Sequence, residues 1–191
     1  MKKIHSFDEV FDGQKVFRTL LEAVSNPGRV VSIEDEAQKM YGDNKAFLAV
    51  AMTLIDNEVT YNTCQNETLG KDISLLTLSR EESLDKADFI FIEDRRNLPE
   101  VFENAKEGTL ADPQKSATFI IKSEEEFTHD IKIYGAGIKD TMIARVPEIA
   151  VEAMELRDSR LYEYPQGVDM IFVTPAGKIL AIPRLVLREG K

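Results

Sequence analysis

Apolar residues recur at helical spacing at the start of the chain, which predicts an amphipathic helix. The members of this pattern are Phe7, Val10, Phe11, Phe17, Leu20, Leu21 and Val24. Ser6 to Glu9 matches a capping box, in which the serine hydroxyl and the glutamate carboxylate satisfy free amides at a helix start. Gly13 interrupts the pattern, and Asp12 offers a second, later start. The helix has to end at Asn26, because Pro27 disfavours helical geometry in the residue before it.

Helical and strand-like segments then follow one another along the rest of the chain. Apolar residues at helical spacing predict helices over residues 45–55, 69–78, 98–105 and 147–156. Short β-rich or fully apolar runs predict strands over residues 29–33, 59–63, 88–92, 117–121, 131–134, 170–173 and 179–182. The acidic runs at 34–36 and 124–126 are interpreted as solvated turns.

The order of these elements predicts an α/β fold with a mixed sheet. Helices and strands alternate over the first hundred or so residues, which suggests parallel strands with helices on the faces of the sheet. The later strands are adjacent in sequence, which suggests antiparallel pairing. A length of 191 residues fits one domain with a sizeable core, and no repeat or linker divides it, so residues 1–191 are expected to form a single domain.

The composition of the chain limits the cellular compartments and the classes of binding partner that can be expected. The formal net charge of −10 makes nucleic acids and anionic membranes poor partners for the whole surface. A single cysteine excludes an internal disulfide and favours a reducing compartment. The N-terminal residues contain no apolar stretch of the kind found in secretory signals, and no apolar run approaches the roughly 20 residues of a membrane helix. We therefore expect a cytoplasmic protein.

The residues that commonly carry chemistry do not form a recognisable catalytic or metal-binding motif. His5 and His129 lie far apart in sequence, so no cluster of metal ligands is predicted. Cys64 is interpreted as a packed small side chain rather than a nucleophile. The run 135–137, Gly-Ala-Gly, lacks the third small residue of a dinucleotide-binding turn, and Asp140 stands there instead. A carboxylate at that position would repel a pyrophosphate, so a simple bend is favoured.

The segment from Tyr164 to Leu185, YPQGVDMIFVTPAGKILAIPRL, predicts two antiparallel strands with an unusual entry and exit. Asp169 precedes the first apolar strand, and Arg184 follows the second, so the pairing brings their side chains near each other. Two interpretations are open: a structural ion pair that holds the corner, and an anion or partner site in which Arg184 donates hydrogen bonds. If the pair is exposed, Arg184→Ala should cost about 1 kcal/mol or less.

Several segments together resemble the PhnH family, which belongs to the bacterial carbon–phosphorus lyase system. They are FRTLLEAVSNPGR at 17–29, LIDN at 54–57, GTLADP at 108–113 with AT at 117–118, GAGI at 135–138, and residues 164–184. Each is short, but they follow in order over nearly the whole chain, which makes the combination specific. The chain departs from the family at 75–83, where the family usually carries a His-Thr-Gly-like turn and this sequence reads Leu-Thr-Leu-Ser at 76–79.

The resemblance implies a three-layer α/β/α sandwich similar to pyridoxal-phosphate-dependent transferases but without their cofactor site, so no cofactor is expected. It implies a homodimer that joins subunits G, I and J in a core complex. That complex transfers a phosphonate to ribose C1 of ATP with loss of adenine, the ribose 1-methylphosphonate 5-triphosphate synthase step. Arg18, Asp169 and Arg184 match the family pattern and are candidate binding or interface residues, and no catalytic residue is carried over.

Two functional hypotheses follow. The first is an accessory subunit of a phosphonate-processing assembly, not catalytic by itself, which predicts an exposed apolar patch for a partner. The second is a free-standing enzyme of the transferase fold that binds a nucleotide or pyridoxal phosphate, which predicts a deep pocket with a desolvated lysine or a glycine-lined phosphate cradle.

Overall fold

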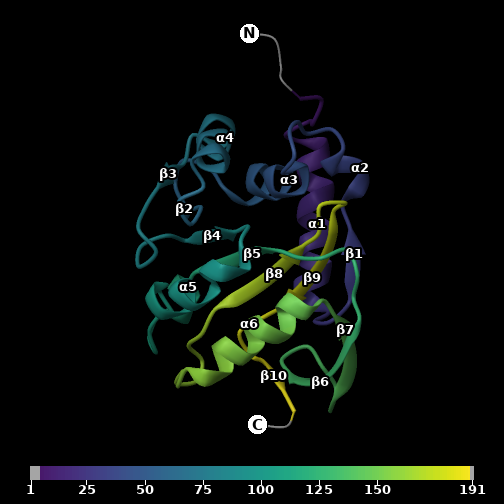
Figure 1. The fold of residues 1–191 in the computed structure, drawn as a ribbon, viewed down its shortest axis with the longest axis vertical. Helices are drawn as coiled ribbons and strands as arrows, with labels where there is room; N and C mark the ends of the chain where they lie inside the picture. Colours follow the sequence, from purple (N-terminus) through teal and green to yellow (C-terminus); the bar gives the residue numbers. More distant parts are fainter. Residues whose placement is uncertain (1–4, 190–191) are drawn as a thin grey trace.

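Seven strands form the main sheet of the computed structural model, which describes residues 5–189 (Figure 1). In spatial order they are β1 (Val30–Ser32), β9 (Lys178–Ile182), β8 (Asp169–Val173), β5 (Thr118–Lys122), β4 (Phe89–Ile92), β2 (Thr60–Asn62) and β3 (Arg80–Glu81). Neighbours from β8 to β3 pair in parallel, whereas β9 is antiparallel to both β8 and β1. The predicted mixed sheet is therefore confirmed.

Three further strands form a small antiparallel sheet in the lower part of Figure 1. Its order is β10 (Val186–Arg188), β6 (His129–Gly135) and β7 (Met142–Val146). The expected antiparallel pairing of sequence neighbours is correct for β8 and β9, but it is wrong for β5 and β6, which lie in different sheets. The difference follows from burial: β5 is buried from Phe119 to Ile121, as a central parallel strand requires, whereas β6 is largely exposed.

Helices cover both faces of the main sheet, and two hydrophobic clusters fill the space between them. The first cluster joins one sheet face to α1 (Phe11–Ser25), α2 (Glu34–Ala37), α3 (Lys45–Leu54) and α4 (Glu67–Thr77). The second joins the opposite face to α5 (Leu98–Asn104), α6 (Glu148–Ser159) and the small sheet. Between residues 5 and 189, no helix is both long enough and apolar enough to cross a membrane.

The start of α1 differs from the predicted capping box. The Asp8 carboxylate, rather than Ser6, accepts hydrogen bonds from the backbone amides of Val10 (3.0 Å) and Phe11 (2.8 Å). The Asp12 carboxylate accepts in turn from the amide of Asp8 at 2.9 Å. The two aspartates therefore satisfy the free amides reciprocally, and the Ser6 hydroxyl contacts the carbonyl of Lys39 instead.

Most of the predicted apolar pattern at the N-terminus faces solvent. Phe7 and Leu20 are buried as members of the first cluster. Val10, Phe11, Phe17, Leu21 and Val24 are exposed. The side of α1 that packs on the sheet consists instead of Val16, Leu20 and Ala23. Because Val10, Phe17, Leu21 and Val24 recur at helical spacing on the outer side, we call this group the α1 stripe.

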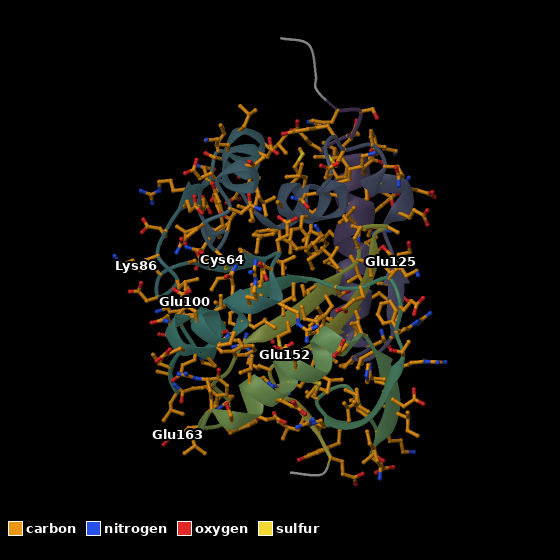
Figure 2. The ribbon with its side chains drawn as sticks, viewed as in Figure 1. Cys64, Lys86, Glu100, Glu125, Glu152 and Glu163 are labelled. Carbon is orange, nitrogen blue, oxygen red and sulfur yellow. The ribbon has the colours of Figure 1, made fainter. Side chains whose placement is uncertain are left out.

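Some elements were missed or misread in the sequence. Strands β7 and β10 and the two-residue β3 were not predicted, and the acidic run 34–36 forms the short helix α2 rather than a turn. In the second acidic run, Glu125 is not merely solvated (labelled in Figure 2): its carboxylate accepts a hydrogen bond from the amide of Ala176 at 2.7 Å and pairs with Lys178. It therefore attaches the 124–126 segment to the turn between β8 and β9.

The N-terminal segment is attached to the protein by an ion pair between the buried Asp12 and the partly exposed Lys39. The Lys39 ammonium lies 2.6 Å from a carboxylate oxygen of Asp12, whose side chain is almost fully buried. Burial alone would raise the pKa of Asp12, but hydrogen bonds from the Asp8 amide and from Lys39 outweigh it, so that the pKa is lowered. A lowered carboxyl pKa stabilises the folded state above the unfolded value of about 3.9, and this stabilisation is lost as the pH falls through the folded value.

We predict that Asp12→Asn lowers the free energy of unfolding by about 1–2 kcal/mol at pH 7, because the Asp8 amide and Lys39 lose a charged acceptor. Urea unfolding measures the effect, and the difference from the unmodified protein should shrink between pH 5 and pH 3. Glu67→Gln, in the exposed pair with Lys71, is the control and should change stability by less than about 0.5 kcal/mol. An undiminished difference at pH 3 would contradict the assignment of the effect to the Asp12 charge.

Candidate functional site

The corner predicted from the sequence is formed where β8 begins and β9 ends. Met170 and Ile182 are paired in the register of these strands, so Asp169 and Arg184 lie just beyond the last pair. The Arg184 guanidinium donates to both carboxylate oxygens of Asp169, at 2.6 and 3.3 Å, and the backbone amide of Arg184 donates to the same carboxylate at 2.8 Å. Arg184 also donates to the carbonyl of Pro113. Arg184 therefore connects three segments of the chain.

The glycine run at 135–137 forms the opposite wall of this corner. Gly135 has φ of 121°, and a Cβ atom there would overlap the carbonyl oxygen of Leu185. Gly137 also has a left-handed backbone, with φ of 82°. The run is thus a bend that permits close approach of two backbones, as the sequence indicated, and it follows β6 without opening a helix.

A cavity of about 480 Å³, here called the corner cavity, lies between these walls. It has the size of a small-molecule site, and both apolar and charged or polar side chains line it. Its lining residues are Gly135, Ala136, Arg157, Asp158, Arg160, Tyr162, Tyr164, Gln166, Arg184, Leu185 and Leu187. The sequence identified Arg184 in this set, whereas the segment that follows α6 supplies two tyrosines and an arginine that were not predicted.

The arginines of the corner cavity are already occupied by protein groups. Arg157 is only 2% exposed and donates to the carbonyl oxygens of Val186 (2.6 Å) and Pro183 (3.4 Å). Burial lowers the pKa of Arg157, although the neighbouring carboxylate of Asp158 opposes this effect. Arg157 therefore holds β10 against the exit of β9, which is a structural role.

Arg160 and Tyr162 form the outer part of the lining. The Arg160 guanidinium lies 6.0 Å from the centre of the Tyr162 ring, within the range of a cation–π contact, and 3.8 Å from a carboxylate oxygen of Glu107. Burial raises the pKa of Tyr162. This arrangement offers a planar aromatic and cationic surface for binding, but it presents no nucleophile paired with a base.

Cys64 lies elsewhere, in the loop after β2, and it is poorly suited to nucleophilic chemistry. Burial, reinforced by the carboxylates of Glu100 and Glu81, raises the pKa of its thiol to about 12. A thiol with such a pKa stays protonated at neutral pH, and the thiolate is the reactive form. This agrees with the interpretation of Cys64 as a packed side chain. Within residues 5–189, no group of three or more histidines, cysteines or acidic residues could hold a metal ion.

Arg18 is not part of the corner. It lies on the exposed side of α1, next to Leu21 of the α1 stripe in the following turn, and it forms no ion pair with any residue of the described range 5–189. The structure thus brings together two of the three candidate residues, Asp169 and Arg184, and places the third beside an exposed apolar surface. The missed residues Arg157, Arg160 and Tyr162 had one sequence signal, a run of arginines and tyrosines just before Pro165.

Comparison with known proteins gives a consistent picture. A family model described as "Bacterial phosphonate metabolism protein (PhnH)" matches residues 5–187. A protein from Stutzerimonas stutzeri, named putative C-P lyase subunit protein HtxG, is 28% identical over 173 residues, which cover 90% of this chain and 83% of the relative. The alpha-D-ribose 1-methylphosphonate 5-triphosphate synthase subunit PhnH of Rhizobium meliloti (strain 1021) is 25% identical over 187 residues, 95% of this chain and 92% of the relative.

We predict that Arg184→Ala lowers the free energy of unfolding by about 2 kcal/mol, more than expected for an exposed pair. The partly buried Asp169 carboxylate would lose its guanidinium donors and keep only the backbone amide of residue 184, and the Pro113 carbonyl would lose the guanidinium donor. Chemical denaturation measures the loss. Arg18→Ala removes an equal side chain with no such partners and should change stability by less than about 0.5 kcal/mol. Equal effects of the two substitutions would show that the corner pair is not a structural anchor.

Proposed function

The chain belongs to the PhnH family of bacterial phosphonate metabolism proteins, and from this we propose that it is a subunit of a carbon–phosphorus lyase complex. In this proposal it joins subunits G, I and J and supports transfer of a phosphonate to ribose C1 of ATP with loss of adenine. The name of the Rhizobium relative, a subunit of a ribose 1-methylphosphonate 5-triphosphate synthase, supports this step. The protein acts in the cytoplasm, as one domain, and has no catalytic role of its own. A relation of its fold to the pyridoxal-phosphate-dependent transferases is part of the same proposal.

The subunit role rests on the family match, and the observation on this chain that supports association with another protein chain is the exposed α1 stripe. Phe17 is 51% and Leu21 is 55% exposed, and Val10 and Val24 extend the same side of the helix. Single exposed apolar residues are common, but several of them on one side of a helix mark a surface that binds another protein. The accessory-subunit hypothesis predicted an exposed apolar patch of this kind.

We assign the α1 stripe to the contact between two copies of this chain. Val10 and Val24 each lie seven residues from Phe17. A twofold axis through Phe17 would therefore place Val10 of one helix opposite Val24 of the other, which is the self-complementarity that a symmetric dimer requires. Arg18, beside the stripe, would lie at the edge of this contact, where arginine is frequent in interfaces. Asp169 and Arg184 are left as candidates for contact with the other subunits.

Co-expression with tagged cognate G, I and J subunits, followed by affinity capture and sizing, tests the subunit role. We expect this chain to elute with the others in a defined complex. Elution of the chain alone would reject the proposal and favour the alternative, a free-standing enzyme that binds a nucleotide or pyridoxal phosphate.

We predict that Leu21→Asp shifts the purified chain from dimer to monomer at micromolar concentration, because a carboxylate within an apolar contact has to be desolvated. Light scattering coupled to gel filtration measures the mass. Leu75→Asp is the matched control, since Leu75 is 56% exposed on another helix, α4, and should leave the dimer intact. A dimer that survives Leu21→Asp would show that the two copies meet elsewhere.

A further inference from the structure

A second cavity, of about 810 Å³, lies at the carboxyl ends of the parallel strands β2, β4 and β5. The chain leaves β2 towards β3 on one side, through α4, and it leaves β4 towards β5 on the other side, through α5. The loops that follow β2 and β4 therefore run in opposite directions. In open α/β sheets, ligands bind in the crevice at such a switch point. The loops after β2, β4 and β5 line this switch-point cavity, and Cys64 marks its position in Figure 2.

A network of polar side chains from four segments lies at the cavity. The Glu93 carboxylate, after β4, accepts hydrogen bonds from Lys122 (2.6 Å) and from the amide groups of Asn66 (2.5 Å) and Asn44 (3.3 Å). Lys122 also donates to the side-chain oxygen of Asn44 at 3.3 Å. Asn66 in turn accepts from the amide of Leu69 at the start of α4. Each group is therefore held in a fixed orientation by its neighbours.

The loop between β2 and α4, which lines the same cavity, is held in an unusual backbone conformation. Cys64 and Gln65 have φ of 51° and 67°, two consecutive left-handed residues that are not glycine. The conformation is secured by the side chain of Asn62, which accepts from the Cys64 amide at 2.8 Å, and by the Thr63 hydroxyl, which contacts Asn66 and Glu81. A loop held in this way is preorganised, which lowers the entropic cost of binding a ligand.

The network has hydrogen-bonding capacity to spare. Lys122 has three N–H donors and uses two, and the Asn66 amide has a second N–H. Asn97, at the N-cap of α5, does not cap that helix, and its side chain forms no hydrogen bond with any residue in the range 5–189. A 3-10 turn, Arg95–Asn97, precedes α5 and is capped by Asp94, so the side chain of Asn97 is not needed as a cap. Its side-chain amide instead lines the cavity, free to bind a ligand as both donor and acceptor.

The charges around the cavity select against an anion. The carboxylates of Glu93, Asp94 and Glu124 line it. The two lining cations are engaged, Lys122 with Glu93 and Arg95 with Glu152. Among these described lining residues, a phosphate would meet the carboxylates without a free cation. Hydroxyl groups both donate and accept, so they suit a mixture of amides, an ammonium group and a carboxylate.

We infer that the switch-point cavity binds the uncharged, polyhydroxylated part of a small molecule, a sugar ring with free hydroxyl groups. The choice of ribose among such rings rests on the proposed function, whereas the site itself rests on the network around Glu93 and on Asn97. In this site, the Asn97 amide and the spare N–H groups of Lys122 and Asn66 donate to ring hydroxyls.

Two-dimensional ¹H–¹⁵N NMR of the full chain, titrated with methyl β-D-ribofuranoside, tests this inference. We expect shifts of the amides at 63–66, 93–97 and 122–124, and binding about fivefold weaker for the 2-deoxy analogue, which lacks one hydrogen-bonding hydroxyl. Asn97→Ala should weaken binding of the riboside by about the same factor without unfolding the protein, because its side chain makes no bond within the described range 5–189. Asn57→Ala is the matched control and should leave binding unchanged, because Asn57 is an exposed asparagine in the turn before β2 whose side chain likewise makes no hydrogen bond within residues 5–189.

Three results would overturn the inference: no shifts at these amides, equal binding of the 2-deoxy analogue, or larger shifts of the same amides with inorganic phosphate, which would make it an anion site. The riboside titration and the co-expression experiment can fail independently of each other. A chain that joins G, I and J but ignores the riboside would reject only the sugar site, and a chain that binds the riboside but elutes alone would reject only the subunit role.

Discussion

Burial of both faces of the central parallel strands is the constraint on which the rest of the structure depends. Along β4, Ile90 and Ile92 belong to one hydrophobic cluster and Phe91 to the other. Strand β5 alternates in the same way, with Phe119 and Ile121 facing opposite to Ile120. Because neither face can meet water, helices have to cover both, and polar groups are left only at the ends of the strands. Both cavities are found at such ends.

This constraint also explains how much of the fold could be predicted. The runs that became β4, β5, β8 and β9 are fully apolar over most of their length, and their sequences alone indicate buried strands. Strands at the surface have no such pattern: β7 alternates buried and exposed residues, and β10 has three residues. In α1, apolar residues stand on two sides of the helix, and spacing alone cannot say which side is covered by the sheet.

The two cavities also differ in how far their residues could be predicted from the sequence. Asp169 and Arg184 are separated by one hairpin, so local pairing was enough to predict that they meet. Glu93, Lys122 and Asn44 come from segments up to 78 residues apart and meet only because the strand order places β4 beside β5. The hydrogen bonds from Arg157 to the segment that enters β10 likewise depend on tertiary packing. Their acceptors are backbone carbonyls, which every residue carries and which sequence therefore cannot identify. Side chains that bind distant backbone groups leave no pattern in a single sequence.

Gly135 has a consequence for how the corner cavity can vary among related proteins. Its backbone lies against the carbonyl of Leu185 with no room for a side chain, so the end of β6 and the segment that enters β10 meet there by main-chain contact. The separation of the cavity walls is therefore set by the backbone, independently of the side chains that line them. Residues such as Tyr162, Tyr164 and Leu187 are free to change and alter what the cavity accepts, while its frame keeps the same dimensions.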